Sequence, residues 1–280
     1  MSTSATPAAP ASATRDRAHA VVSPRRRPRP WVYTRTDTLN TLLRPDMLFF
    51  TVVMPLGMYL FWGALQDYSD YDAGRGNVAA ATMINMSTFS VGIAATCTAA
   101  GAAVEQATGW GRQIALTAGG LRSYTVTKLL TALLVSVCPV TVIFVAGALT
   151  GAKMDTPLVW AASYLLSLLV AVPFACYGLA VGMWVPAQAA VGIAGASISI
   201  YAFLGNLFMP LDGGLLTFAR YTPMYGAGSL ATRALQGDLV ATMTGVIHES
   251  LWVPVANISV WTLVFALVCL AARRRATARR

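Results

Sequence analysis

Hydrophobic positions along the chain fall into six long runs, which polar or glycine-rich segments separate. The runs cover residues 47–65, 79–103, 125–149, 158–183, 187–209 and 251–272. Each has about 19 residues or more, enough for a helix that rises 1.5 Å per residue to cross an apolar layer of roughly 30 Å. The alternating ten-residue segments of a membrane β-barrel do not occur. The pattern therefore predicts an all-α membrane protein with six transmembrane helices.

The two ends of the chain differ from this central part. Residues 1–30 are rich in Ala, Ser, Pro and Arg, and such a segment buries too little apolar surface to offset the entropy of ordering. We therefore expect a disordered basic tail, then a six-span domain over residues 31–272 and a second basic tail over residues 273–280. The segment "WVYTRTDTLNTLLRP" (31–45) fits a short amphipathic helix lying in the membrane interface.

Composition agrees with a membrane protein. Hydrophobic residues make up 56% of the 280 residues and charged residues only 11%, whereas a soluble domain has about 25% charged residues. The formal net charge of +9 does not indicate nucleic-acid binding, because the basic residues cluster at the chain ends and beside the apolar runs. The chain has 18 arginines but 2 lysines, a bias that suggests a GC-rich bacterial genome.

The basic residues also predict the orientation. Cytoplasmic segments of membrane proteins carry the excess of Lys and Arg. If both termini and the 104–124 and 184–187 linkers are cytoplasmic, four basic residues lie outside, namely Arg75, Lys153, Arg220 and Arg233. Sixteen then lie inside, namely Arg15, Arg17, Arg25, Arg26, Arg27, Arg29, Arg35, Arg44, Arg112, Arg122, Lys128, Arg273, Arg274, Arg275, Arg279 and Arg280.

The segment between the fifth and sixth runs, residues 210–250, is then extracellular. It is half apolar and is interrupted by Gly213, Gly214 and Pro223. It fits short re-entrant helices that enter the outer leaflet, or an ordinary amphipathic loop. His248 and Glu249 lie at its end, either as a proton-sensitive pair or as a solvated loop pair.

Common catalytic motifs are absent from the sequence. The only lysines, Lys128 and Lys153, follow Thr127 and Ala152, so there is no GxxxxGK[ST] phosphate-binding loop. "HESLW" lacks the second histidine of a zinc peptidase, and no GxSxG element occurs. The cysteines each lie in an apolar run, at positions 97, 138, 176 and 269. We predict no catalytic residue, no metal site and no cofactor bound by this chain.

Polar residues within the runs are hydroxyls and amides, with small residues between them. Asn85 and Thr88 lie in the second run, and Ser197 and Asn206 lie in the fifth. One interpretation is simple packing of helices within the chain, as small residues allow close approach. The other is that these four residues line a mildly polar translocation path between two copies of the chain.

The linker "VEQATGWGRQIALTAGGLRSYTVTK" (104–128) is too polar to cross the membrane. Its central part can form a short helix on the cytoplasmic surface, before Gly119 and Gly120 interrupt it. Tyr124 and Lys128 are expected at the lipid–water boundary, where the lysine can extend its ammonium group toward water. Such a helix could transmit a push from a cytoplasmic partner.

This linker resembles the coupling-helix signature of type-two ABC transporter permeases, the family of drug-resistance and natural-product exporters. The resemblance extends from about Thr36 to the C-terminus, and the residues that carry it in the linker are Glu105, Gly109, Trp110, Arg112, Gln113, Leu116, Thr117, Tyr124 and Lys128. The chain departs from the family at Ala118 and Gly119, where a proline and a leucine are usual. The geometry of that turn is therefore left open.

The resemblance implies a permease that works as a homodimer, or as a heterodimer with a sister permease, on two separate ATPase subunits that bind ATP and Mg²⁺. It implies efflux of an amphipathic small molecule, drug or lipid across a bacterial cell membrane. Two other classes stay open. A scaffold or sensor could dock a cytoplasmic partner through the same linker, and a lipid- or glycan-handling membrane protein is a further alternative.

Overall fold

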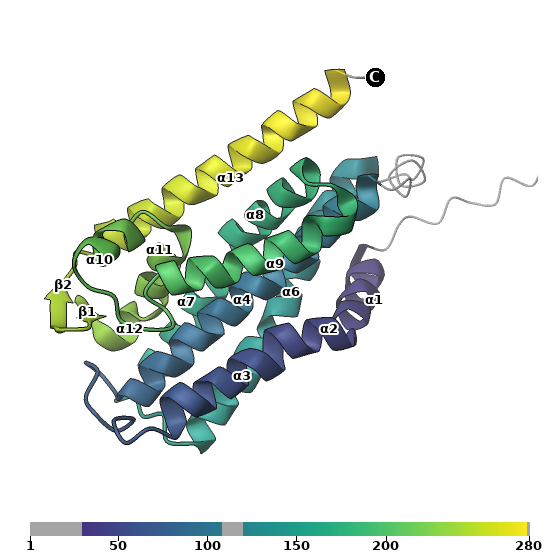
Figure 1. Cartoon of the computed structure of the whole chain (residues 1–280). Coiled ribbons are helices and arrows are strands. Elements are labelled where there is room, and N and C mark those ends of the chain that lie inside the picture. Colours follow the sequence, from purple (N-terminus) through teal and green to yellow (C-terminus); the bar gives the residue numbers. More distant parts are fainter. Residues whose placement is uncertain (1–29, 108–119, 279–280) are drawn as a thin grey trace, which may run out of the picture.

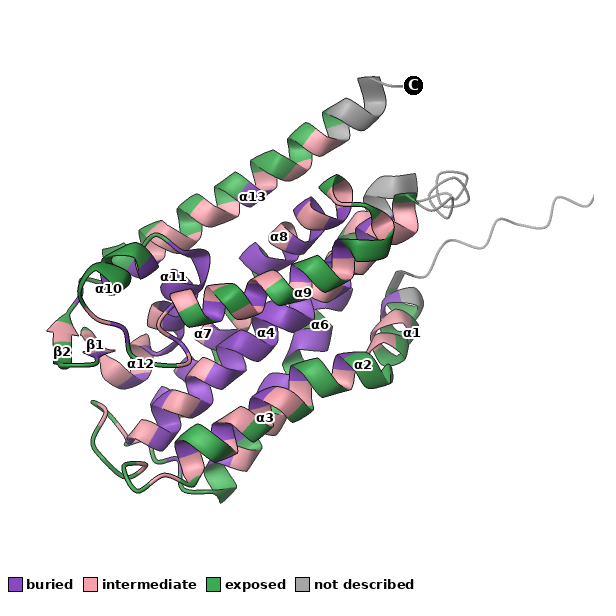
Figure 2. Ribbon diagram, in the orientation of Figure 1, coloured by how far each residue is buried: buried purple, intermediate pink, exposed green. Residues whose placement is uncertain are grey.

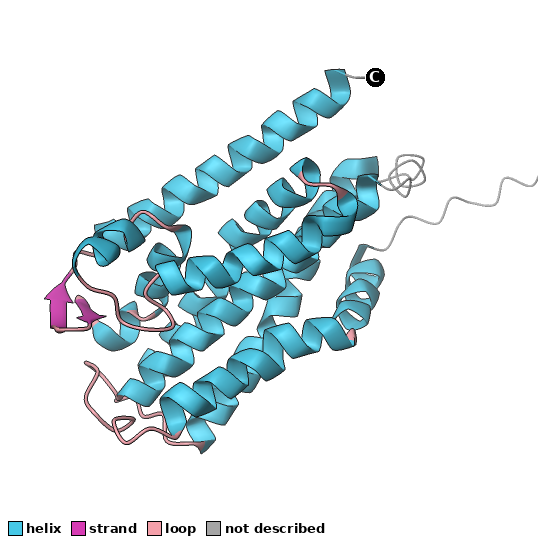
Figure 3. Cartoon of the chain, viewed as in Figure 1, coloured by secondary structure: helices cyan, strands magenta, loops and turns pink. Residues whose placement is uncertain are grey.

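The computed structural model describes residues 30–107 and 120–278, and its regular structure is almost entirely helical (Figures 1 and 3). The first part comprises α1 (Pro30–Leu42), α2 (Pro45–Leu48), η1 (Phe49–Val53), α3 (Met54–Tyr59) and η2 (Leu60–Ala64). The longer helices are α4 (Val78–Glu105), α6 (Gly120–Leu149), α7 (Pro157–Leu169), α8 (Ala171–Trp184), α9 (Ala187–Leu204) and α13 (Trp252–Ala278). Between α9 and α13 lie α10 (Gly213–Ala219), α11 (Pro223–Ala231), α12 (Arg233–Gln236), β1 (Leu239–Thr242) and β2 (Gly245–His248).

Six helical segments in the described ranges are long and apolar enough to cross a membrane, which confirms the predicted fold class. They are Pro45–Ala64, Val78–Glu105, Tyr124–Leu149, Pro157–Trp184, Ala187–Leu204 and Trp252–Ala272. The first contains two π-helical turns, η1 and η2, on either side of α3. Pro55 is the second residue of α3 and has no N–H to donate, and a wider turn is one way in which a helix continues past a proline.

Helix α4 lies at the centre of the bundle, and the other long helices surround it (Figures 1 and 2). Of the apolar stretch of α4 that could span a membrane, 83% is buried within the chain, compared with 6% of the corresponding stretch of α13. The side chains of α4 are mostly alanine, serine, threonine and glycine, which occupy little space and let neighbouring backbones come close. The outer helices expose their large apolar side chains, as expected for surfaces that contact lipid.

The closest approach to α4 is made by α8, through two glycines. A Cβ atom built on Gly178 would lie 2.1 Å from the carbonyl oxygen of Thr96, and one on Gly182 would lie 2.6 Å from that of Ala100. The Thr96 hydroxyl also donates a hydrogen bond to the Phe174 carbonyl across this contact, at 3.1 Å. The segment "GLAVG" (178–182) therefore serves helix packing within the chain, the first of the two interpretations of the small residues in the apolar runs.

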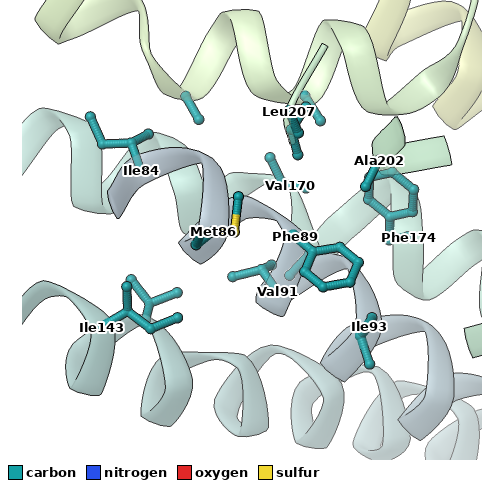
Figure 4. Packing of buried hydrophobic residues seen from close by; sticks show 14 of the residues in the cluster. Ile84, Met86, Phe89, Val91, Ile93, Ile143, Val170, Phe174, Ala202 and Leu207 are labelled. Atoms are coloured by element: carbon teal, nitrogen blue, oxygen red, sulfur yellow. The ribbon is translucent and has the colours of Figure 1, made fainter. Parts of the chain in front are cut away.

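Larger side chains fill the space where the small-residue contact ends. Phe89 and Val91 of α4 pack with Phe174 of α8 and Ile143 of α6 in one continuous cluster of buried hydrophobic residues (Figure 4). Both phenylalanine rings are fully buried. Such a cluster fixes the rotation of α4 relative to its neighbours, because each side chain fits between specific partners.

The fifth span ends at Leu204, earlier than the predicted residue 209. Asn206 adopts a left-handed backbone conformation with a φ of 63°, which ends the helix. Its side chain accepts a hydrogen bond from the Leu211 amide at 2.6 Å and donates one to the Ala241 carbonyl at 3.1 Å. These bonds hold the segment after α9 against strand β1.

Residues 210–250 contain short helices, as one of the two sequence interpretations expected, and also a β-hairpin that was not predicted. Strands β1 and β2 pair in antiparallel register, with Leu239 opposite His248. Helices α10 and α11 each begin after a capping side chain, Asp212 and Thr222 respectively. Entry of these helices into the outer leaflet stays a prediction. We call this end of the bundle, which also holds the 65–77 loop, the hairpin end, and the opposite end, with α1, the tail end (Figure 1).

Helix α13 continues past the predicted last residue of the sixth span, Ala272, as far as Ala278. Of the predicted disordered tail, residues 1–30, the structure describes Pro30 as the first residue of α1, and residues 1–29 lie outside the described residues.

The α4–α8 contact predicts a matched pair of substitutions. We expect Gly178→Ala to lower the free energy of unfolding by about 1–3 kcal/mol, because its methyl group would overlap the Thr96 backbone. Gly192→Ala in α9 adds the same methyl group where no atom lies within 4 Å, so it should leave stability unchanged or slightly higher. Unfolding midpoints of the two purified variants in mild detergent test this. Equal midpoints would contradict the close backbone approach.

Candidate functional site

At the tail end, an ionic cluster joins α1, α4 and α6. The ammonium group of Lys128 on α6 lies 2.7 Å from Oδ1 of Asp37 on α1 and 3.0 Å from Oε2 of Glu105, the last residue of α4. The side chain of Lys128 is 7% exposed, that of Asp37 16% and that of Glu105 44%. The cluster is therefore buried on the lysine side and open to its surroundings at Glu105.

Tyr124 supports this cluster from one helical turn earlier on α6. Its buried hydroxyl donates a hydrogen bond to Oε2 of Glu105, and the Lys128 ammonium lies 5.7 Å from the centre of its ring. Residues four apart on a helix share a face, so Tyr124 and Lys128 both reach Glu105. The end of α4 and the start of α6 are thus held together on either side of the 106–119 connection.

The cluster satisfies charges that would be unfavourable alone. A single ammonium group at the edge of an apolar bundle loses hydration, and a nearby carboxylate offsets that loss only when the geometry is close. Lys128 has two such partners. The expected extension of its side chain to water is therefore wrong, because the ammonium group turns inward to the two carboxylates.

The predicted partner-coupling residues divide into two groups. Glu105, Tyr124 and Lys128 come together in the ionic cluster. The others lie outside the described residues and stay predictions, namely Gly109, Trp110, Arg112, Gln113 and Leu116. Sequence reasoning missed Asp37. It lies 91 positions from Lys128, and only its place in the N-terminal amphipathic segment could have indicated a role.

A cavity of about 710 Å³ lies at the opposite end of α4. Its walls are formed by the end of the first span, by the loop that follows it and by the first turns of α4. The segment after α9, helix α11 and the β-hairpin complete the walls. Two of the predicted path-lining residues, Asn85 and Asn206, are part of this wall. The volume is in the range of small-molecule sites, roughly 300–1,000 Å³.

The other two predicted path-lining residues lie elsewhere. Thr88 is fully buried in α4 and donates its hydroxyl hydrogen bond to the Ile84 carbonyl in the same helix. Ser197 on α9 is hydrogen-bonded to the hydroxyl of Tyr177 on α8 at 2.6 Å. Neither is part of the cavity wall, and their place in a path between two copies of the chain stays a prediction.

Behind the cavity wall, Glu249 is buried rather than solvated. Its carboxylate accepts hydrogen bonds from the Tyr225 hydroxyl at 2.7 Å and from Ser229 at 3.2 Å, and Nε of Arg220 lies 3.3 Å away. Burial raises the pKa of the Tyr225 hydroxyl, and the neighbouring carboxylate acts in the same direction. The phenol therefore stays protonated as a donor.

His248 does not pair with Glu249, so neither sequence interpretation of these two residues as a pair is correct. The Nδ1 atom of His248 lies 2.8 Å from Oδ2 of Asp238 instead, across the start of the hairpin. This contact is exposed, and it lowers the pKa of the Asp238 carboxyl. The buried carboxylate lies behind the cavity wall, bonded to the wall residues Tyr225 and Ser229, and the histidine lies at the surface.

No model of a known protein family matches the chain. A protein of Bacillus subtilis (strain 168) with the name "Putative transport permease YvfS" is 25% identical over 194 residues, which are 68% of this chain and 78% of that protein. This similarity favours a family of permeases without distinguishing the exporter permeases among them. With the six apolar helices, it supports a multi-pass membrane protein.

The ionic cluster predicts different effects for the two lysines. Lys128→Met would leave two carboxylates close together and uncompensated, so we expect a loss of about 3 kcal/mol in unfolding free energy. Lys153→Met removes a lysine whose pair with Asp70 is about 70% exposed on both sides, so it should leave stability unchanged within error. The midpoints of unfolding in a denaturing-detergent titration give both values. A Lys128→Met protein as stable as the Lys153→Met control would contradict the structural role of the cluster.

Proposed function

We propose that the chain is the membrane-spanning permease subunit of an ATP-driven exporter, coupled to a separate ATPase subunit, and that it moves an amphipathic small molecule, drug or lipid outward. The observation that carries this proposal is the ionic cluster of Asp37, Glu105 and Lys128. It joins three helices at the end of α4 and near the start of α6, the two helices that the 106–119 connection links.

The cluster holds together the two helices that this connection links. A force applied by a cytoplasmic partner to residues 106–119 would reach α4 through Glu105 and α6 through Tyr124 and Lys128. Because the same lysine also contacts Asp37, α1 would move with them. Coupling between distant sites is carried by packed elements and by networks of hydrogen bonds and ion pairs, and this arrangement contains both.

Helix α4 extends from the cluster to the cavity. Its 28 residues give a length of about 42 Å at 1.5 Å per residue. Glu105 is at one end, and Asn85 lines the cavity near the other. A displacement of α4 would thus change the shape of a ligand-sized space at the far end of the bundle, as an ATP-driven exporter requires.

Hydrolysis of ATP is assigned to another chain. Neither lysine of this sequence follows a glycine, so the phosphate-binding loop that would hold ATP and Mg²⁺ is expected in the partner ATPase. The similarity to a protein named as a putative transport permease supports a transport role for this chain, with ATP hydrolysis in another chain. We propose a dimer of permeases, either two copies of this chain or one copy with a sister chain.

The first test is purification of the tagged protein from its native membrane in mild detergent. We expect a soluble protein with a phosphate-binding loop to co-purify, and the complex to hydrolyse ATP in a vanadate-sensitive manner. Trp110→Asp should abolish the stimulation of ATPase activity by cargo, and Trp110→Phe should keep it, because the proposed contact with the partner is apolar. An intact protein without an ATPase partner, or full stimulation with Trp110→Asp, would favour a scaffold or sensor instead.

The proposed orientation can be tested separately. Asp67→Cys, in the exposed 65–77 loop, should react with a membrane-impermeant maleimide in intact cells. Arg274→Cys, near the end of α13, should react only after the cells are permeabilised. The native cysteines lie within the helices, and the unsubstituted protein gives their background. The reverse labelling pattern would exclude an exporter with cytoplasmic termini.

A further inference from the structure

We propose that the cavity at the hairpin end binds an amphipathic organic cation, with the apolar body of the ligand against aromatic rings and its positive group near Asp72. That this ligand is the exported cargo depends on the proposed function. Binding itself does not, because the walls of the cavity belong to a single chain.

The cavity has the size and the mixed lining of a ligand site. About 710 Å³ is available to a ligand, and the wall is mainly apolar, with a few polar side chains from separate elements. Pockets for small molecules are mostly apolar, and a small number of placed polar groups fix the orientation of the ligand. Three such groups, those of Asp72, Asn85 and Gln236, are part of this wall.

Aromatic rings form one side of the wall. Trp62 at the end of the first span and Tyr68 and Tyr71 in the loop after it are 43%, 41% and 67% exposed. Rings this exposed next to a cavity are available for contact with a ligand. The face of an aromatic ring attracts a cation, most strongly in tryptophan, and quaternary ammonium ligands are recognised in this way.

The charge of the wall favours a positive ligand. Asp72 is the one ionisable acidic residue among the wall residues, and none of the wall residues is a lysine, an arginine or a histidine. The described cations that lie in this loop or contact it are occupied or line another pocket. Lys153 pairs with Asp70 at 2.8 Å, and Arg75 lines a separate pocket. An anion in the cavity would meet a carboxylate with no compensating charge.

Two amide side chains of the wall have no protein partner in the described structure. Those of Asn85 and Gln236 make no hydrogen bond with another described residue. An amide in a membrane-spanning helix is unfavourable unless something bonds to it. Asn85 belongs to such a helix, so a ligand with hydrogen-bonding groups is a natural partner. These amides would orient the polar part of the ligand, while the rings hold its apolar part.

The test uses two probes that differ in charge and have the same body. Benzyltrimethylammonium and phenylmethanesulfonate share a benzyl group and carry a tetrahedral head group of opposite sign. Their binding to the full-length protein in lipid nanodiscs is measured by saturation-transfer NMR titration, with empty nanodiscs as the blank. We expect the cation to bind at least about tenfold more tightly than the anion, because attraction by rings and carboxylate becomes repulsion for the sulfonate.

Substitutions assign the binding to this cavity. Asp72→Asn should weaken binding of the cation about three- to fivefold, and Trp62→Ala should have an effect of similar size. Asp67→Asn is the matched control. It removes the same charge from the same loop at an exposed residue outside the wall, so affinity should stay within about twofold.

Three results would overturn the proposal. The first is equal affinity for the two probes, and the second is an equal effect of Asp67→Asn and Asp72→Asn on binding of the cation. The third uses an additional neutral probe, phenyl glucoside, and is tighter binding of this probe than of the cation, without dependence on Asp72. The last would indicate a site for neutral glycosides. These measurements need no ATPase, so their failure is distinct from failure of the proposed function. A cation site in a protein without an ATPase partner would instead indicate a ligand-sensing membrane protein.

Discussion

Helix α4 can occupy the centre of the bundle because α8 approaches it with almost no side chain between the two backbones. In a membrane, lipid tails solvate apolar side chains as well as another helix does, so association depends on close packing and on hydrogen bonds between helices. Gly178 and Gly182 provide the first, with hypothetical Cβ atoms closer than 3 Å to the α4 backbone. The hydrogen bond from Thr96 to Phe174 provides the second. The other helices are then arranged around this pair.

A buried central helix also explains why the features of interest lie at the ends of the bundle. Along its middle, α4 is covered by α6, α8 and α9 and is lined with small or apolar side chains. Glu105 meets Lys128 at one terminus, and Val78 and Asn85 contribute to the cavity near the other. A rigid, well-packed helix with a functional group near each end is suited to transmit movement, because its centre cannot easily deform.

The sequence predicted the six spans well, because long apolar runs have no other stable arrangement in a membrane. It also selected Glu105, Tyr124 and Lys128 from the linker, although it expected the ammonium group of Lys128 to extend toward water rather than toward two carboxylates. The role of Asp37 could not be predicted, since no local sequence pattern relates it to a lysine 91 residues later. The β-hairpin was missed because its strands have only four residues each. The burial of Glu249 depends on Tyr225, Ser229 and Arg220, which only the tertiary fold brings to it.

Charged residues are few in this chain, so whether a charged side chain has a partner of opposite sign is informative about its role. Several charged groups in the described loops and helix ends have a partner of opposite sign, as in Arg44 with Asp46 and Lys153 with Asp70. Those side chains do not need a ligand to balance their charge. Asp72 has no ion pair with a described residue, and it borders a cavity with three exposed aromatic rings. Asp67 also lacks such a pair but contacts no cavity. An uncompensated charge is informative only where a space adjoins it, and at Asp72 the size, apolar lining and sign of that space together indicate a cationic ligand.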